Sequence, residues 1–445
     1  MGHYKRYGWI VLYGIALSAV IIYSFKGTGE PVKPQEPDKV TLTFRHFWTK
    51  EHDLPVLRIF QDIVNEYERT HPNVKVNFEG IDQTVHREQK LKSEMVTGTP
   101  PEMFVLFAGA EMEPYIRSNR LMDLSGFVEQ NQLSFQDLHL WKGEDGQGVY
   151  GLPFEGHAEP LYYNRRIFGK LGIEPPETLD DLNAAVRKLR ASGYTPFALG
   201  NEEQWPAGVY AHYLMDRFAG PELIEKLVRG EEGASFRNGG YLKAFDLLQQ
   251  WSKEGALGGS PGSASTEEAI RMFTHGEAAM YVGGSWDITL FRSDSAPDGF
   301  ERDIGVMPFP SLEAGEARSI AGGYTIGIGL SSNLTEAQRE AALEFLKAVY
   351  TEEAQARLVY EAARIPSMTI DYDPVKTGPV FNQVAKFMQE SESSFVAYDN
   401  VLSPEVKKSF LSVLDKLLSN AISGEEALMQ LDKASEAYWK LRRSS

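Results

Sequence analysis

The chain of 445 residues carries a formal net charge of −17, contains no cysteine, and is 42% hydrophobic and 24% charged. Its length predicts two soluble domains, and its acidic balance argues against a nucleic-acid partner, because binding to phosphate backbones requires clustered lysine and arginine. The absence of cysteine excludes disulfides, thiolate metal sites, a cysteine nucleophile and a lipid-modified N-terminal cysteine.

Residues 1–26 predict a membrane segment that exports the rest of the chain. Lys5 and Arg6 precede an uncharged run over residues 8–25. A helix over that run is about 27 Å long, enough to cross a hydrocarbon core, and the early positive charges favour an N-terminus that stays inside. The apolar run continues through residues 20–23, beyond a small-residue cleavage site, which favours an uncleaved anchor over the alternative of a signal peptide.

Residues 27–39 are polar and proline-rich and predict an extended linker. The folded region that follows carries apolar residues at alternating positions in short runs and at helical spacing in longer ones. Its first part predicts a strand, a helix, a strand, a helix and a strand over residues 40–47, 54–69, 73–78, 83–97 and 103–107. Helices of this length between strands favour a parallel sheet with helices on both faces.

The same alternation resumes after residue 150. Strands are expected over residues 161–163, 195–199, 278–282, 304–306 and 324–330. Helices are expected over 179–192, in the stretch up to residue 250, and over 336–350, 352–363, 404–420 and 424–441. The pattern predicts two α/β lobes without a short internal repeat.

Six sequence phrases follow one another in a fixed order along this region. They are MVTGTPPE at 95–102, DGQGVYGLPF at 145–154, LYYNRRIF at 161–168, GIEPPETL at 172–179, GEAAMYVGGSW at 276–286 and IGVMPFP at 304–310. By their order and spacing, the chain resembles the family 1 extracellular solute-binding proteins, the sugar receptors of ATP-driven importers. The resemblance extends over nearly the whole of residues 40–441.

The resemblance implies a periplasmic-binding-protein-like α/β fold, in which two lobes joined by a three-stranded hinge enclose a ligand cleft. Lobe 1 would comprise residues 40–152 and 307–353, and lobe 2 residues 153–306 and 354–445. The implied function is capture of a sugar or oligosaccharide and its delivery to the permease subunits of an ABC importer. We expect the receptor to act as a monomer.

A sugar site needs exposed aromatic rings, which stack on the C–H faces of a sugar, beside polar groups that bond to its hydroxyls. Trp286 lies just beyond an expected strand, where open α/β sheets bind ligands, and the resemblance assigns a sugar-stacking tryptophan there; a core tryptophan is the alternative. Trp205 lies in a polar loop with Asn201. Trp48 ends the first expected strand, shortly before Glu51.

Further candidates lie near the expected hinge. His157 takes the position at which a family member presents an acidic sugar ligand, and Glu155 could supply the acid instead; an exposed hinge residue is the alternative. Gly323 and Tyr324 follow, where glycine would let the backbone approach a ligand or would simply form a turn. Arg364 faces the cleft in similar proteins, or acts as a helix C-terminal cation. The complete candidate set is Trp48, Glu51, Phe107, Glu155, His157, Asn201, Trp205, Trp286, Gly323, Tyr324 and Arg364, of which Phe107 is the most core-like.

No cofactor, metal ion or catalytic residue is expected, because the sequence has no phosphate-binding loop, no nucleophile elbow and no zinc-binding histidine pair. A glycosidase would need two carboxyls about 5–10 Å apart, and Glu155 and Glu159 keep that alternative open. A tethered sensor is the other alternative, because closure on a ligand would serve a signalling partner equally well. We expect the protein on the outer face of the bacterial membrane, tethered by residues 8–25, or secreted if that segment is cleaved.

Overall fold

The computed structural model describes residues 39–258, 262–315, 319–391 and 394–444. The membrane segment expected at residues 1–26 and all but the last residue of the expected linker lie outside the described residues. Residues 40–445 form one compact unit. Among the helices that the structure describes, none is long and apolar enough to cross a membrane.

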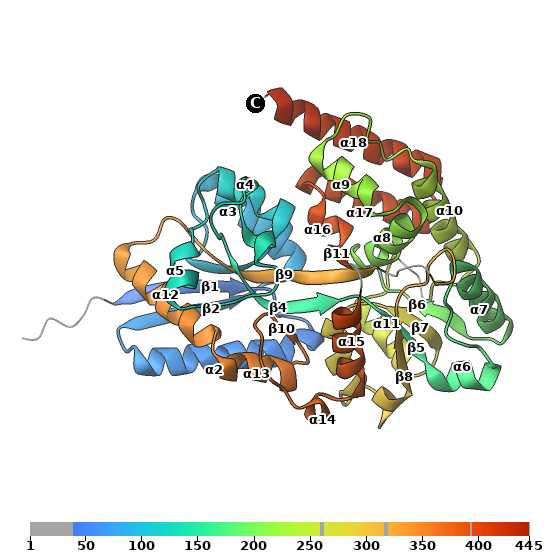
Figure 1. The fold of residues 1–445 in the computed structure, drawn as a ribbon, viewed down its shortest axis with the longest axis horizontal. Helices are drawn as coiled ribbons and strands as arrows, with labels where there is room; N and C mark the ends of the chain where they lie inside the picture. The colour runs from blue at the N-terminus through green and yellow to red at the C-terminus, as the bar shows by residue number, and fades with distance from the viewer. Residues whose placement is uncertain (1–38, 259–261, 316–318, 392–393, 445) are drawn as a thin grey trace, which may run out of the picture. The chain divides into compact units, whose positions relative to one another are not determined.

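The first of two sheets has strand order β10-β4-β9-β3-β1-β2, with β11 paired to β9 (Figure 1). Its strands are β1 (Val40–His46), β2 (Val74–Gly80), β3 (Met103–Phe107), β4 (Leu152–Ala158), β9 (Ile320–Leu330), β10 (Ile365–Pro366) and β11 (Ser394–Phe395). β1 runs parallel to β2 and β3, as expected, whereas β9 runs antiparallel to β3 and β4. The parallel prediction is wrong for β9, because the chain reaches this strand from the second sheet and not through a crossover helix.

The second sheet has strand order β6-β7-β5-β8. Its strands are β5 (Leu161–Asn164), β6 (Thr195–Ala198), β7 (Ala278–Val282) and β8 (Ile304–Met307). β5 runs antiparallel to both β7 and β8, and β6 runs parallel to β7. The chain therefore passes from the first sheet to the second between β4 and β5, and returns between β8 and β9.

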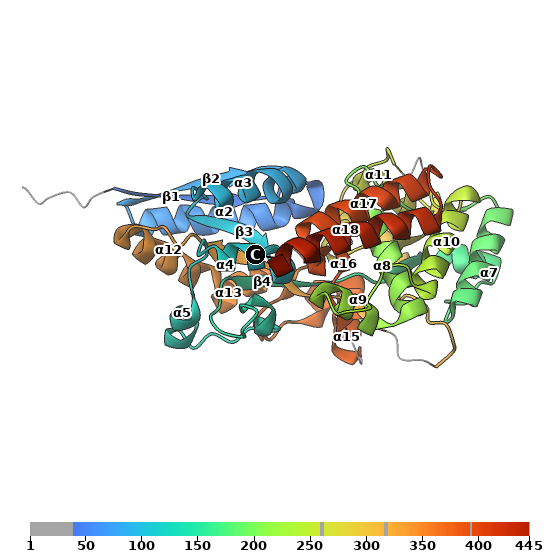
Figure 2. The same ribbon diagram turned by 90° about the horizontal axis from the view of Figure 1, so that it is seen from above.

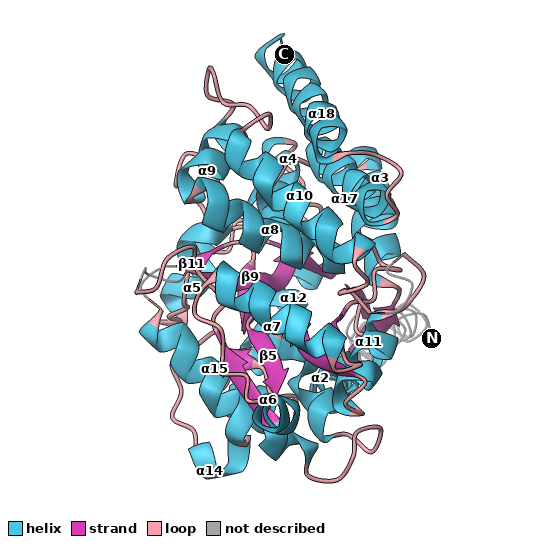
Figure 3. Cartoon of the chain, turned by 90° about the vertical axis from the view of Figure 1, so that its right-hand side faces the viewer, coloured by secondary structure: helices cyan, strands magenta, loops and turns pink. Residues whose placement is uncertain are grey.

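Helices pack around the strands of both sheets (Figure 3). Those in contact with the first sheet and its core are α2 (Leu54–Thr70), α3 (Leu91–Thr97), α4 (Glu113–Arg117), α5 (Ser125–Gln130), α12 (Glu336–Val349) and α13 (Glu352–Tyr360). The others are α6 (Arg165–Leu171), α7 (Leu179–Ala191), α8 (Pro206–Ala219), α9 (Pro221–Arg229), α10 (Gly239–Lys253), α11 (Thr266–Thr274), α14 (Pro374–Thr377), α15 (Pro379–Glu390), α16 (Tyr398–Val401), α17 (Pro404–Leu418) and α18 (Gly424–Ser444). α17 and α18 lie side by side (Figure 2).

The local sequence explains why several of these helices form where they do. α2 buries Val56, Ile59, Phe60, Val64 and Tyr67, which recur at helical spacing and form one apolar face. Capping boxes begin α7, α11 and α12, so that side chains satisfy the first free backbone N–H groups. The helix expected over 83–97 instead begins as the π-helical segment η2 (Val85–Lys90) before α3.

Candidate functional site

A cavity of about 90 Å³ is walled by segments that follow strands of both sheets. The wall on the side of the first sheet comprises Phe47, Lys50, His52, Asp53, Asp82, Gln83, Thr84, Arg87, Phe107, Glu155, His157 and Ile326. The opposite wall comprises Glu159, Glu203, Trp205, Val209, Thr266, Glu267, Trp286, Ala397, Asp399 and Asn400. Ligand pockets in proteins are typically concave, aromatic-lined and furnished with a few polar groups, and this cavity has all three properties.

Two tryptophans form an aromatic corner in the cavity. The ring centroids of Trp205 and Trp286 lie 5.9 Å apart at 69°, and the ring of His157 lies 5.5 Å from that of Trp286. Both tryptophans are partly exposed. Trp286 lies in η5 (Ser285–Arg292), directly after β7. A side chain at Gly284 would come within 2.1 Å of the indole, so glycine is what lets the ring occupy this place.

Three buried polar side chains along and just beyond β4, those of Glu155, His157 and Glu159, line the cavity. The Nδ1 atom of His157 has no hydrogen-bond partner among the described residues. Burial lowers the pKa of His157, which keeps its imidazole neutral. Burial raises the pKa of Glu155 to about 7, although the Arg364 cation acts in the opposite direction. Glu159 Oε2 lies 3.1 Å from Nε2 of His212.

Arg364 lies behind the cavity wall, where it is 2% exposed. One of its terminal nitrogens donates to Asp53 Oδ1 at 2.8 Å and to the carbonyl of His52 at 3.3 Å, while Nε lies 3.0 Å from Glu155 Oε2. Burial nevertheless raises the pKa of Asp53 to about 6. Arg364 thus orients two carboxyls of the cavity wall and does not line the cavity itself.

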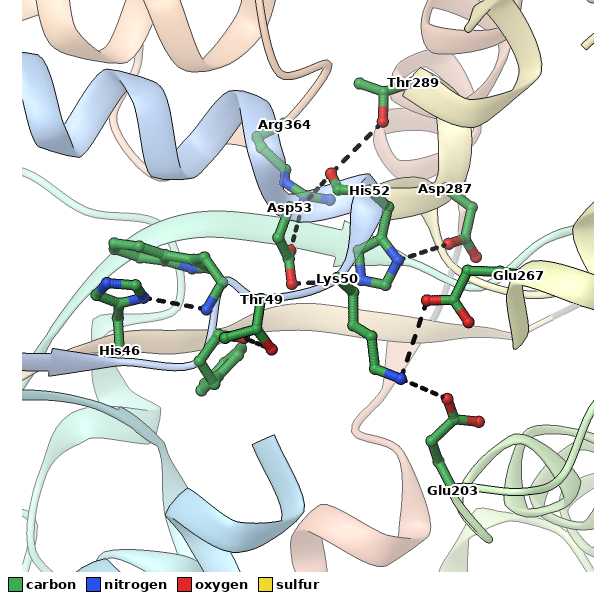
Figure 4. A network of polar contacts seen from close by, with 12 residues as sticks. His46, Thr49, Lys50, His52, Asp53, Glu203, Glu267, Asp287, Thr289 and Arg364 are labelled. Atoms are coloured by element: carbon green, nitrogen blue, oxygen red, sulfur yellow. Dashed lines mark hydrogen bonds and ion pairs between the residues drawn. The ribbon is translucent and has the colours of Figure 1, made fainter. Parts of the chain in front are cut away.

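A polar network crosses from the segment after β1 to the loop after β6, to α11 and to the segment after β7 (Figure 4). Lys50 Nζ lies 3.0 Å from Glu203 Oε1 and 3.9 Å from Glu267 Oε1. His52 Nδ1 lies 3.6 Å from Asp287 Oδ1. These contacts join the two walls beside the cavity.

Most of this network was not predicted from the sequence. Lys50, His52, Asp53 and Asp287 were not among its candidates, although all four lie in or against the cavity wall. The charged run from Lys50 to Asp53, directly after an aromatic strand end, is a signal that could have indicated them. The residues that pair with this run could not have been identified from the sequence, because they lie more than 150 positions away along the chain.

Five of the expected ligand-binding residues line the cavity: Phe107, Glu155, His157, Trp205 and Trp286. The guanidinium of Arg87 lies over the Phe107 ring, 3.4 Å from its centroid, and so covers one face of this ring. The structure therefore brings together candidates from β3, from β4 and from the segments that follow β6 and β7.

Three other candidates lie away from the cavity. Trp48 is 2% exposed and packs on the rings of Phe60 and Phe154 at 4.3 and 5.6 Å, so it belongs to the core of the first sheet. The Asn201 Oδ1 atom accepts from the backbone N–H of Ala207 and thereby holds the start of α8. Glu51 is exposed and accepts a hydrogen bond from a serine of the loop after η5.

Gly323 and Tyr324 are also separate from the cavity. Both line another hollow, together with Asp137 and residues of α15. The ring of Tyr324 lies against Gly156, where a side chain would come within 2.4 Å of it. Gly323 has a φ of +134°, which only glycine adopts freely, so its role here is in the backbone of β9.

No metal centre can be assigned within the described ranges, where no group of three or more histidine, aspartate or glutamate side chains could hold an ion. The carboxylate of Asp373 caps α14 by accepting a hydrogen bond from the backbone N–H of Val375 at 2.9 Å.

The buried carboxyl of Glu155 gives a testable dependence of stability on pH. Its folded pKa, about 7, lies above the ordinary 4.5, so the folded state binds more protons between these values. The stabilisation linked to this group is therefore complete below about pH 4.5 and is lost as the pH rises through 7. We expect the difference in unfolding free energy between the wild type and Glu155→Gln to fall by ~3 kcal/mol from pH 4.5 to 7.5 in urea titrations. A difference that is constant or rises over this range would contradict the assignment.

Residues 54–356 match the family model of the bacterial extracellular solute-binding proteins. The chain belongs to this family. It is 27% identical over 411 residues to an ABC transporter extracellular-binding protein of Pyrococcus horikoshii, covering 90% of this chain and 87% of the relative. It is 23% identical over 364 residues to a multiple sugar-binding protein of Streptococcus mutans, covering 80% and 81%. A solved chitin oligosaccharide binding protein has a TM-score of 0.86 and 28% identity, covering 90% of this chain and 99% of its own.

These findings confirm the family resemblance and the periplasmic-binding-protein-like α/β fold class expected from the sequence. The cavity between the two sheets of this solute-binding protein is accordingly the candidate site for its solute.

Proposed function

We propose that this solute-binding protein captures a sugar or oligosaccharide between two closing lobes outside the cell and delivers it to the permease of an ABC importer. The observation that carries the proposal is the corner formed by Trp205 and Trp286 beside the neutral, buried His157. Aromatic faces stack on the C–H faces of sugars, and a buried ring nitrogen needs a partner such as a hydroxyl. The names of relatives that bind multiple sugars or chitin oligosaccharides support the same ligand class.

We propose that each sheet forms the centre of one lobe. This assignment differs from the expected lobes, which placed residues 153–158 and 365–366 in lobe 2, because β4 and β10 pair within the first sheet. The hinge would then consist of the passages from β4 to β5, from β8 to β9, and from β10 to α14. The last passage lies further along the chain than the expected boundary at residue 353, because α13 packs on α2 of the first lobe. Closure would bring the tryptophans of the second lobe against the polar groups of the first.

We infer that the protein binds its sugar without turnover. Glu155 and Glu159 line one cavity, and a raised pKa is a property that Glu155 would share with a general acid. Each of the two is, however, engaged by a fixed cation or histidine, Arg364 and His212. Chromatography of an oligosaccharide after prolonged incubation should recover it intact, whereas shortened products would favour the glycosidase alternative.

We propose that the protein is located at the outer face of the cell membrane. Support comes from the uncharged run at residues 8–25, which follows Lys5 and Arg6. Mass spectrometry of the native N-terminus should find this segment intact; its loss would favour a secreted form. We propose that the receptor acts as a monomer, which sedimentation would test.

Lys50 offers a test of closure that leaves the sugar contacts of the tryptophans in place. Lys50→Ala removes the ion pairs to Glu203 and Glu267, and so should favour the open state and weaken saccharide binding ~3–5-fold. The effect is modest because the lysine is about one-third exposed. Calorimetric titration measures it, with Lys386→Ala on α15 as a surface control. An unchanged affinity would show that this pair does not contribute to closure.

A further inference from the structure

The described residues that line the cavity carry an excess of acids. Its two walls contribute seven carboxyls, three from the side of the first sheet and four from the opposite side, against two permanent cations, Lys50 and Arg87. The histidines do not offset the difference, because burial lowers the pKa of both His52 and His157. A negative excess in a partly enclosed space attracts a cationic solute and repels an anionic one.

Both cations of the lining are already paired with the protein's own groups. Lys50 Nζ lies between the carboxyls of Glu203 and Glu267 (Figure 4). The Arg87 guanidinium donates to Glu111 Oε2 at 2.9 Å and to the side-chain oxygen of Asn400 at 3.0 Å. Neither cation is therefore available to a carboxylate or phosphate group of a solute.

The cation behind the wall does not remove the acidic excess. Arg364 is shared between Asp53 and Glu155, with nitrogen–oxygen distances of 2.8 and 3.0 Å. Burial nevertheless raises the pKa of both carboxyls. One guanidinium thus faces two buried acids, and this part of the wall has more carboxyls than cations.

Glu159 holds a buried carboxyl that the fold leaves without a hydrogen bond. The residue lines the cavity and is 3% exposed, and its Oε2 atom has no hydrogen-bond partner among the described residues. Nε2 of His212 lies 3.1 Å away but is not hydrogen-bonded to it. The backbone of Glu159 is instead fixed on both sides, because its N–H donates to the Ala321 carbonyl at 2.9 Å and its carbonyl accepts from the Tyr213 hydroxyl at 2.5 Å. The backbone contacts therefore set the place of this residue, and its side chain is left to a ligand.

A protonated amine is the group that this carboxyl and its surroundings fit best. A buried acceptor without a partner is costly, and an ammonium group brings three donors and a full positive charge, whereas a hydroxyl brings one donor and no charge. The corner formed by Trp205 and Trp286 adds to the preference, since the faces of aromatic rings attract cations.

We propose that the cavity selects a saccharide with a free, protonated amino group, which it binds at the carboxylate of Glu159, and that it excludes acidic sugars. The inference rests on the proposed function and narrows its ligand to one chemical class. Exclusion follows from the same excess of acids, because a uronic acid or a sugar phosphate would bring a negative charge among carboxyls whose cations are already paired.

Sugars that differ in one substituent test the proposal. The purified full chain is titrated by calorimetry at about pH 6.5, where a sugar amine is protonated, with glucose, glucosamine, N-acetylglucosamine and glucuronic acid, each as a single unit and as a disaccharide. The corresponding galactose series is titrated in parallel. In the series that binds, the amine should bind at least ~10-fold more tightly than its neutral parent, and the uronic acid at least ~10-fold more weakly.

The outcomes of these titrations separate the inference from the function on which it rests. An amine that binds no more tightly than its neutral parent or its N-acetylated derivative would overturn the inference and leave sugar capture intact. Failure of every saccharide to bind, including the case in which the linear polyamine spermidine binds alone, would contradict the proposed function and the inference together.

A charge-removing variant tests the assignment to Glu159. Glu159→Gln keeps the shape of the side chain and should reduce the ratio of amine affinity to neutral-sugar affinity at least ~5-fold. Glu390→Gln is the matched control, because Glu390 is a two-thirds exposed residue of α15, and it should keep the wild-type ratio. Retention of the full ratio in Glu159→Gln would overturn the proposal. If that variant does not fold, the titrations of the wild-type chain decide.

Discussion

Trp286→Ala should weaken saccharide binding by at least ~30-fold, because a central aromatic platform commonly accounts for about 2 kcal/mol or more of a binding free energy. The indole is partly exposed and forms one side of the aromatic corner with Trp205, near His157. Because it is not a core side chain, its loss should change the unfolding free energy by no more than ~1 kcal/mol. Calorimetry and urea unfolding of the same sample measure both quantities.

A tryptophan outside the cavity provides the matched control. Trp439 is likewise partly exposed, but it lies on α18, where its ring N–H donates to the Leu227 carbonyl at 3.2 Å. Trp439→Ala should bind saccharides with wild-type affinity. If Trp286→Ala also binds with wild-type affinity, the sugar does not occupy the cavity proposed for it.

Arg364→Met should reduce the unfolding free energy by ~3–5 kcal/mol at pH 8, because removing one partner of a buried ion pair leaves the other charge uncompensated. Here the uncompensated groups are two carboxyls, Asp53 and Glu155, with pKa values already raised by burial to about 6 and about 7. At pH 5 both are largely protonated, so the loss should be much smaller. Urea titrations at the two pH values measure the difference.

Two variants show whether the loss arises from these charges. Arg339 is exposed on α12 and lies 3.8 Å from Glu336, so Arg339→Met should cost less than ~0.5 kcal/mol. Adding Asp53→Asn and Glu155→Gln to Arg364→Met should restore part of the stability at pH 8. A loss at Arg364 that is equal at both pH values would show that packing, and not charge, is responsible.

The sequence predicted most elements within a few residues, because their apolar spacing is strong. It did not predict the helices α6, α11 and α15. It also did not predict β10 and β11, which have two residues each and are too short to show a pattern. Nor could periodicity reveal the direction of β9, since an antiparallel strand alternates as a parallel one does in a half-buried sheet. The direction of a strand within its sheet depends on the side from which the chain enters it.

The candidate site was predicted unevenly for a similar reason. Trp286 follows a strand and His157 lies within one, and the family resemblance implied where both strands lie in the fold. Both residues line the cavity. Trp48 also ends a strand, but its side chain turns toward Phe60 and the core, and a strand-end position alone does not distinguish these outcomes. The contact of Lys50 with Glu203 joins residues 153 positions apart and requires the folded arrangement.

The most direct test of sugar capture is calorimetric titration of residues 40–445, which form one compact unit, against a panel of mono- and oligosaccharides. We expect at least one saccharide to bind with a stoichiometry of one and to be recovered intact, and Trp286→Ala to weaken that binding at least ~30-fold. Binding of a different solute class with no response to any saccharide, or saccharide binding that persists unchanged in Trp286→Ala, would contradict the account.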